Sequence, residues 1–359
     1  MFEFLNNWLA NGSFWVAVPL IIVGCAALIK GADFLVDGAS ALAKKYGVSD
    51  IVIGLTVVAF GTSMPEFVVN MVAVGQGSTE IAITNVLGSN IINIFVILGC
   101  TALIFPISSQ KSTRRFDIPF SLLAALLVLL FAVYNSPSWL QIEHIFNMNI
   151  ADPTLSDLGS IQMGQGNGGF ISGVGGSILL IFFLIFLWHN FKGIGSAPQT
   201  ESNEEYKPMS ARRALALIIG GLVGLVVGGE VIVKSATSIA QSLGVSDAII
   251  GLTVVALGTS LPELATSCMA AFKKNCDIAL GNVIGSNLFN IFFILGTSAC
   301  VKALPGYHGL EIDALMAALG SVLVMLFVYL TKKHEIKRWH GAILLLTYAA
   351  YLAYRIITL

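Results

Sequence analysis

Charged side chains are scarce in this chain. Asp, Glu, Lys and Arg make up 11% of its 359 residues, whereas about a quarter of the residues in a soluble globular domain are charged. Hydrophobic residues make up 56% of the sequence, and the mean hydropathy is +0.85. This composition excludes an ordinary soluble domain and predicts a protein that lies in a lipid bilayer. With a formal net charge of −1, we expect no nucleic-acid partner.

Cysteine is scarce as well. The chain has five cysteines, an odd number, within or at the edges of apolar runs and without the spacing of a metal site. They indicate small packing residues rather than metal ligands or disulfide partners. The first residues also lack the basic stretch and cleavage site of a signal peptide, so we expect no removable signal.

Long apolar runs, in contrast, are abundant. A helix needs roughly 20 apolar residues to cross the hydrocarbon core of a bilayer. The runs predict an all-α integral membrane protein with about ten transmembrane helices. They are residues 14–32, 50–75, 80–105, 117–135, 170–192, 209–233, 247–272, 277–302, 309–331 and 340–358.

Basic residues fall in alternate connections between these runs. Connections rich in Lys and Arg face the cytoplasm. The long segment 136–169 has no Lys or Arg and is therefore expected outside, as are both termini of a ten-helix chain. The basic connections contain residues 44–45, 111–115, 192–213, 273–274 and 332–338.

The sequence contains an internal repeat. A shift of 197 residues aligns "GVSDIVIGLTVVAFGTSMPE" at 47–66 with "GVSDAIIGLTVVALGTSLPE" at 244–263. The same shift aligns "NVLGSNIINIFVILG" at 85–99 with "NVIGSNLFNIFFILG" at 282–296. No gap is needed between the two pairs, which indicates a duplicated unit.

The repeat predicts the organisation of the whole chain. We divide it into a first five-helix repeat at 1–192, a polar cytoplasmic linker at 193–208 and a second five-helix repeat at 209–359. Because five is odd, the second copy enters the membrane in the opposite sense. Inverted repeats are a transporter architecture, with the substrate site near the midplane between the halves.

Each repeat has a proline followed by a glutamate inside an apolar run, at 57–70 and 254–267. Pro65 and Pro262 lack an N–H and clash with the carbonyl four residues earlier, so each helix should break or kink there. In hydrocarbon, freed backbone groups are tolerated only where they line a cavity or meet a ligand. The polar side chains beside the breaks are Thr62, Ser63 and Glu66 in one half and Thr259, Ser260 and Glu263 in the other.

The second pair of motifs adds hydroxyl and amide groups. Ser89 and Asn93 are four residues apart, hence on one helical face, and so are Ser286 and Asn290. Together with two carboxylates and without nearby His or Cys, these groups suit a hard cation. Calcium takes six to eight oxygens at about 2.3–2.6 Å and tolerates flexible mixtures of them.

The charge of this cluster predicts a mode of transport. Two glutamates give it a formal charge of −2, which one Ca²⁺ or several Na⁺ can neutralise. An empty site would leave two adjacent carboxylates in a low dielectric, which is costly. The protein should therefore switch from one open side to the other with one cation bound, and switch back with another cation bound. This mode of transport is exchange. Protons can also neutralise the pair, so acid should compete with metal.

The paired "GTSMPE" and "GTSLPE" with the paired "GSN" elements resemble the two alpha repeats of the calcium/cation antiporters, specifically the sodium/calcium exchanger branch. The resemblance covers both halves except the insertion 136–169. It implies a prokaryotic exchanger of the cytoplasmic (inner) membrane, because the linker is too short for regulatory domains. It implies ion ligands at Glu66, Glu263, Thr62, Thr259, Ser63, Ser260, Ser89, Ser286, Asn93 and Asn290, and at the backbone carbonyls of Ala59 and Ala256.

Within that family, "GTS" in both halves favours sodium, since the proton-coupled branch has an asparagine-containing variant. We expect a secondary antiporter of Ca²⁺ and Na⁺ that works by alternating access, with no cofactor and no enzymatic activity. The alternatives are a Ca²⁺/H⁺ exchanger, a cation channel and a non-transporting scaffold. A channel usually forms its filter from subunits around an axis normal to the membrane, which an in-plane inverted repeat does not provide.

Two further acidic pairs match across the repeat. Asp33 and Glu230 lie in the first helices of the two halves, without a proline break or hydroxyl cluster, so we expect anchoring or gating roles rather than ion ligands. Asp50 and Asp247 in the two "GVSD" elements are expected to be N-cap residues.

Overall fold

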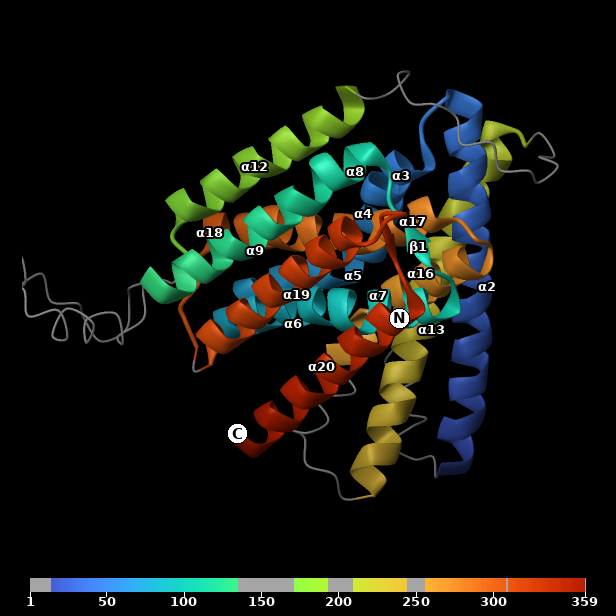
Figure 1. Ribbon diagram of the computed structural model, residues 1–359. Coiled ribbons are helices and arrows are strands. Elements are labelled where there is room, and N and C mark those ends of the chain that lie inside the picture. Colours follow the sequence, from blue (N-terminus) through green and yellow to red (C-terminus); the bar gives the residue numbers. More distant parts are fainter. Residues whose placement is uncertain (1–13, 135–170, 193–208, 244–255, 308, 359) are drawn as a thin grey trace, which may run out of the picture.

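The computed structural model describes residues 14–134, 171–192, 209–243, 256–307 and 309–358, and these residues are mostly helical (Figure 1). In the first half the elements are α2 (Phe14–Tyr46), α3 (Asp50–Ile53), η1 (Gly54–Val58), α4 (Ala59–Thr62), α5 (Met64–Gly75), α6 (Thr79–Ile92), η2 (Asn93–Ile97), α7 (Leu98–Ile104), β1 (Ile107–Ser108), α8 (Lys111–Arg115), α9 (Asp117–Tyr134) and α12 (Gly173–Lys192). In the second half they are α13 (Ala211–Ser242), α15 (Ala256–Thr259), α16 (Leu261–Phe272), α17 (Cys276–Leu288), η4 (Phe289–Leu295), α18 (Gly296–Val301), α19 (Leu310–Leu330), β2 (Glu335–Ile336) and α20 (Arg338–Thr358). The η elements are π-helical.

The predicted membrane architecture is confirmed. Within the described ranges, eight helices are long and apolar enough to cross a bilayer, and the bent pair Asp50–Thr62 and Met64–Gly75 can form a ninth span. The predicted span at 247–272 is described only from Ala256 onward. The predicted number of ten therefore depends partly on residues outside the described ranges.

The first helix of each half extends beyond its apolar run, close to the helices of 14–45 and 209–243 that the sequence predicts. The runs at 14–32 and 209–233 are continued by helices of 33 residues in α2 and 32 residues in α13. In α2 the extension contains Asp33, whose carboxylate is paired with Lys273 at 2.6 Å. A partner from a distant part of the chain thus allows a charged residue to follow the apolar run within the same helix.

The helices α2 and α13 lie side by side at one edge of the molecule, as the blue and gold helices of Figure 1 show. Their backbones approach closely at glycines. A Cβ on Gly31 would lie 2.8 Å from both Gly221 O and Leu225 N, and a Cβ on Gly228 would lie 2.7 Å from Gly24 O. Small residues permit such backbone contact between membrane helices, so the two helices form a tightly packed pair.

The two segments that carry the "GSN" motifs lie at the centre of the rest of the molecule. In an apolar stretch of 18 residues within each span, 94% of the residues are buried in Cys276–Val301 and 72% in Thr79–Ile104, but only 22% in Trp15–Tyr46. Around them α19 packs on α9, α20 on α7 and α12 on α18. We call this assembly of helices, all except α2 and α13, the core.

A short two-stranded sheet joins the connection between α7 and α8 to the connection between α19 and α20. The strands β1 and β2 pair antiparallel, with Ile107 opposite Ile336 and Ser108 opposite Glu335. Two-residue strands of this kind carry too little periodicity to be predicted from the sequence.

The prediction that Asp50 is an N-cap residue is wrong. Helix α3 begins at Asp50, and the extended residue before it, Ser49, occupies the cap position with φ −69° and ψ 147°. The Asp50 carboxylate instead accepts a hydrogen bond from Asn275 Nδ2 at 2.7 Å. A tertiary partner has replaced the local capping bond. Its counterpart Asp247 lies outside the described residues.

Candidate functional site

The proline breaks occur where the sequence predicts them. Helix α4 ends at Thr62 and α5 begins at Met64, and the two segments on either side of Ser63 are bent by 45°. Ser63 has φ −85° and ψ 5°, and its counterpart Ser260, between α15 and α16, has φ −90° and ψ 5°. Each proline lies in the first turn of the following helix, where its missing N–H needs no intrahelical partner.

The second motifs lie next to these breaks, but across the repeat. Helix α17 of the second half packs against α4 and η1 of the first, and α6 of the first half packs against α15 of the second. Asn93 begins the π-helical segment η2, and Asn290 lies in η4. Widened π-helical turns often occur at functional sites because they redirect side chains from the regular helix.

The two glutamates are buried in this region. Glu66 and Glu263 are each 1% exposed. Ser63 Oγ donates to Glu263 Oε1 at 2.9 Å, which joins one break to the carboxylate of the other half. Glu263 Oε2 and both carboxylate oxygens of Glu66 have no hydrogen-bond partner among the described residues. Buried carboxylate oxygens without partners are rare and indicate a cation or another unseen partner.

Several other predicted ligands also have buried oxygens without a hydrogen-bond partner. All lie at the breaks or in the second motifs, and nearly all are almost fully buried. In the described part of the chain, most buried side-chain oxygens that lack a hydrogen bond belong to this region. Besides the carboxylates they are Ser89 Oγ, Asn93 Oδ1, Thr259 Oγ1, Ser260 Oγ, Ser286 Oγ and Asn290 Oδ1.

Thr62 and Ala59, like Ser63, already form hydrogen bonds. Thr62 Oγ1 donates to Asn282 Oδ1 at 3.1 Å and lies 3.3 Å from Ala59 O. Ala59 O also accepts from Ser63 N at 3.0 Å. To bind an ion, this carbonyl would have to release one of these bonds. Its counterpart Ala256 begins helix α15.

Two matched asparagines hold the start of each broken helix, and the sequence analysis missed both. Asn85 Nδ2 lies 3.5 Å from Glu66 O, and Asn282 Nδ2 lies 3.3 Å from Glu263 O. Asn282 Nδ2 also donates to Ser267 Oγ at 2.9 Å. Their repetition at the offset of 197 residues was the signal that could have identified them.

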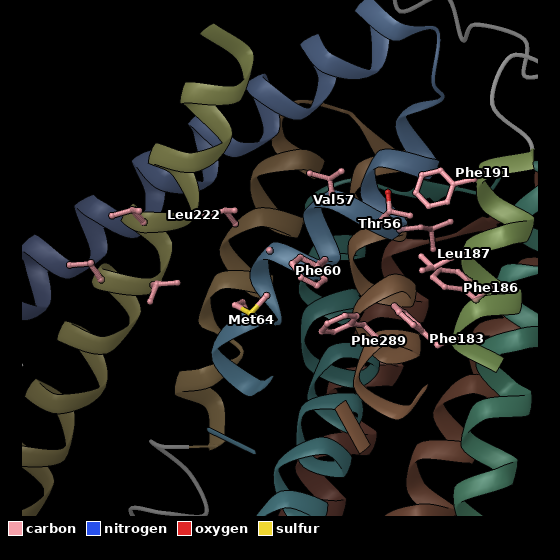
Figure 2. Close-up of a pocket in the computed structure, with 15 residues that line it drawn as sticks. Thr56, Val57, Phe60, Met64, Phe183, Phe186, Leu187, Phe191, Leu222 and Phe289 are labelled. Atoms are coloured by element: carbon pink, nitrogen blue, oxygen red, sulfur yellow. The ribbon is translucent and has the colours of Figure 1, made fainter. Parts of the chain in front are cut away.

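An apolar cavity of about 700 Å³ adjoins the first break (Figure 2). Its walls include Phe60 and Met64 at the break, Phe183 of α12 and Leu222 of α13, and Thr56 contributes a hydroxyl. Figure 2 shows Leu222 facing Phe60 and Met64 across the space. An apolar lining supplies no cation ligands, so this cavity, which lies between α12, α13 and the first break, does not extend the oxygen-rich site.

The remaining acidic pair does not join the site. Asp33 pairs with Lys273 at 2.6 Å and Lys30 at 3.6 Å, and Glu230 pairs with Lys234 at 3.2 Å within α13. These contacts suit the predicted anchoring role. Within the described ranges there is also no cluster of three His, Cys, Asp or Glu side chains that could hold a metal, so the oxygen donors here are mainly hydroxyls and amides.

A family model described as "Sodium/calcium exchanger protein" matches residues 16–192 and 213–357. The chain belongs to the sodium/calcium exchanger family. The resemblance of the repeated motifs to this family is thus confirmed over most of the sequence.

Individual relatives agree with this assignment. The putative antiporter CaxA of Alkalimonas amylolytica is 35% identical over 342 residues, covering 94% of this chain and 97% of CaxA. The sodium/calcium exchanger MaX1 of Methanosarcina acetivorans is 33% identical over 351 residues, covering 93% of this chain and 96% of MaX1. A structure of the sodium-calcium exchanger NCX_Mj soaked without Na⁺ and Ca²⁺ superposes with a TM-score of 0.75 at 31% identity, covering 95% of this chain and 99% of NCX_Mj.

The fold and family together establish a multi-span, all-α membrane exchanger. Further NCX_Mj structures with Na⁺ and Ca²⁺, or with Na⁺ and Sr²⁺, give TM-scores of 0.74 and 0.75. The family and this fold therefore support cation exchange that includes Ca²⁺.

Proposed function

We propose that this exchanger carries Ca²⁺ in one direction and Na⁺ in the other through a single site built around Glu66 and Glu263. The observation that carries the proposal is the group of buried oxygens without partners beside two buried carboxylates. Carboxylate, hydroxyl and amide oxygens are the ligands that Ca²⁺ and other hard cations prefer. The proposed ligands are Glu66, Glu263, Thr62, Thr259, Ser63, Ser260, Ser89, Ser286, Asn93 and Asn290, with the carbonyls of Ala59 and Ala256.

The charge of the site explains why transport is coupled. Glu66 and Glu263 supply −2, and the amides of Asn93 and Asn290 add no charge. One Ca²⁺ neutralises this charge, and so do two Na⁺. Breaking the pairing of a buried charge costs about 3–5 kcal/mol, so a site that empties during the transition is strongly disfavoured. The protein therefore changes between its two open states only with a cation bound, and each ion must be exchanged for another.

Sodium is the counter-ion that the sequence favours. Both breaks carry "GTS", and the relative MaX1 is named a sodium/calcium exchanger. A Ca²⁺/H⁺ exchanger is the second candidate, because protons can neutralise the same two carboxylates. A channel fits less well, since the site oxygens lie almost fully buried between broken helices rather than around an open path.

The helix pair α2 and α13 is the element that we propose moves against the core. The two helices contact each other through glycine backbones, where an added Cβ would lie only 2.7–2.8 Å from the backbone of the other helix. Between α13 and the core the packing is looser, because the cavity of about 700 Å³ lies there (Figure 2). Leu222 and Val233 of α13 contact the core at Gly61 and Gly258. A pair that is tight internally and loose against the core can slide as one body past both breaks and open the site to either face.

The repeat sets the proposed topology. Residues 1–192 and 209–359 form two inverted five-helix repeats, joined by the cytoplasmic linker 193–208. Asn90 and Asn287, which are 197 residues apart, exchange side-chain to backbone hydrogen bonds, as expected of two elements related by a twofold axis. In this proposed topology, the insertion 136–169 and both termini lie on the non-cytoplasmic side of the membrane.

Transport by purified protein in liposomes tests this function. Liposomes are loaded with Na⁺, with a proton gradient or with neither, and uptake of labelled Ca²⁺ is measured for the protein, Glu66→Gln and Glu263→Gln. Glu80→Gln is the matched control, because Glu80 is exposed at the start of α6. We expect uptake driven by Na⁺, lost in both site variants and kept in the control. Uptake with the proton gradient alone would establish the second candidate, and gradient-independent equilibration would establish a channel.

A further inference from the structure

Two asparagines beside the proposed ligands form hydrogen bonds that cross the repeat. Asn90 and Asn287 are 1% and 3% exposed and precede Asn93 and Asn290 by three residues, about one helical turn. Asn93 Nδ2 donates to Asn287 Oδ1 at 3.0 Å, and Asn290 Nδ2 donates to Asn90 Oδ1 at 3.1 Å. Each of Asn93 and Asn290 is therefore held by the half to which it does not belong.

The two inner asparagines also hold each other. Asn90 Nδ2 donates to Asn287 O at 3.3 Å, and Asn287 Nδ2 donates to Asn90 O at 3.4 Å. The four amides, two inner and two outer, are thus linked by one set of hydrogen bonds, which we call the amide ring. No bond of this set joins the two outer asparagines to each other. It consists of Asn90, Asn93, Asn287 and Asn290.

The amide ring fixes which atom of each side chain points into the site. A backbone carbonyl can only accept, so each inner asparagine must present its NH₂ to the opposite backbone and its Oδ1 to the outer asparagine. The outer asparagine must then donate with Nδ2. The Oδ1 of the outer asparagine is then not used within the amide ring. Accordingly, Asn93 Oδ1 and Asn290 Oδ1 are buried without a partner among the described residues.

We propose that Asn90 and Asn287 are positioning residues, which orient Asn290 and Asn93 so that carbonyl oxygens and not NH₂ groups face the transported cation. This inference rests on the proposed site. A flipped amide at position 93 or 290 would place an NH₂ where the cation needs a ligand, and would set its oxygen against the oxygen of the inner asparagine. The ring disfavours both.

In the amide ring each inner asparagine orients the outer asparagine of the other half. This crossed pairing leads to a specific expectation. Truncation of Asn90 removes the acceptor that orients Asn290, but it leaves the bond between Asn93 and Asn287 in place. Asn90→Ala should therefore weaken Ca²⁺ binding through Asn290 and not through Asn93, although Asn93 is nearer in the sequence. A residue that merely holds the two halves together would show no such selectivity.

The test is a set of double-mutant cycles on equilibrium binding of labelled Ca²⁺ by the purified full chain. Loss of a residue that orients a metal ligand typically costs 10–100-fold in affinity. We expect Asn90→Ala to raise the Kd by about that factor in the wild-type and Asn93→Ala backgrounds, and by less than about twofold in Asn290→Ala. The mirror cycle with Asn287→Ala should lose its effect in Asn93→Ala and keep it in Asn290→Ala.

A matched control is Asn190→Ala. Asn190 is also buried, 5% exposed, but its Nδ2 donates to Phe186 O within α12. This variant should leave the Kd unchanged. Equal losses in all backgrounds would overturn the positioning role, and so would failure of both Asn90→Ala and Asn287→Ala to give monodisperse protein, because the ring would then serve to join the halves. If the wild type does not bind Ca²⁺, or Glu66→Gln binds it unchanged, the proposed site itself is wrong.

Discussion

One lysine joins the helix pair to the core, and its removal should bias the exchanger toward one face. Lys273, in the turn after α16, lies 2.6 Å from Asp33 Oδ1 and 2.6 Å from Asp37 Oδ1, both on α2. It also donates to Asp33 O at 3.2 Å. The equivalent turn of the first half has Gln76, which cannot form an ion pair. This latch, Lys273 with Asp33 and Asp37, therefore holds only one end of the pair.

The strength of the latch follows from its exposure. The side chains of Lys273 and Asp33 are 27% exposed and that of Asp37 is 52% exposed. Partly exposed ion pairs of this kind contribute about 0.2–1 kcal/mol each, so we assign about 0.4–2 kcal/mol to the two together. That corresponds to a change of about 2–30-fold in the equilibrium between two conformations. The basic turn containing Lys273 is expected at the cytoplasmic face, so the latch favours the state that is closed there.

The assay is the apparent Ca²⁺ affinity measured separately at the two faces of the protein in liposomes. Apparent affinity scales with the fraction of molecules whose site is open to that face. Lys273→Gln should therefore raise the affinity at the cytoplasmic face and lower it at the other, changing their ratio by about 2–30-fold. Ionic strength raised with an inert salt should move the wild type toward the variant, because screening weakens exposed pairs.

Lys30→Gln is the control for the latch. Lys30 is 70% exposed and lies 3.6 Å from Asp33 on the same helix, so its loss removes a charge near Asp33 without releasing α2 from the core. Equal changes of the affinity ratio in both lysine variants, or an unchanged ratio in Lys273→Gln, would refute the role of the latch.

Three further outcomes are expected. Ca²⁺ at 100 times its Kd should stabilise the folded protein by about 2.7 kcal/mol, seen as a raised unfolding midpoint in detergent that Glu66→Gln lacks; an equal rise in the variant would contradict the site. Gly31→Val should destabilise the protein by about 1–3 kcal/mol, because a Cβ there would lie 2.8 Å from the backbone of α13; an unchanged midpoint would disprove the tight pair. Tyr351→Phe removes a 2.8 Å bond to Asp313 and should cost about 1.5–3 kcal/mol without changing Ca²⁺ affinity, which a shift in Kd would contradict.

Much of the fold depends on local rules, and the sequence therefore predicts it. Apolar runs of about 20 residues mark the membrane helices. Pro65 and Pro262 mark the breaks, because a proline cannot continue the hydrogen bonding of the preceding turn. The repeat then indicates that the two breaks face each other, and the bond from Ser63 to Glu263 agrees with that arrangement.

The parts that escaped prediction depend on partners far away in the chain. The ion pair of Asp33 with Lys273 joins residues 240 positions apart. Asn90 and Asn287 lie within the "GSN" motifs, but a single asparagine in a helix is an ordinary packing residue. Their importance follows from bonds between the halves, which no local pattern contains.

The central claim is that one site between Glu66 and Glu263 binds both transported ions. The most direct measurement is anomalous X-ray scattering from crystals of the protein soaked in Sr²⁺, a heavier analogue of Ca²⁺, at low and at high Na⁺. We predict one peak within about 2.6 Å of carboxylate oxygens from both glutamates, which disappears as Na⁺ is raised. A peak elsewhere, or one at this site that high Na⁺ does not displace, would contradict the account.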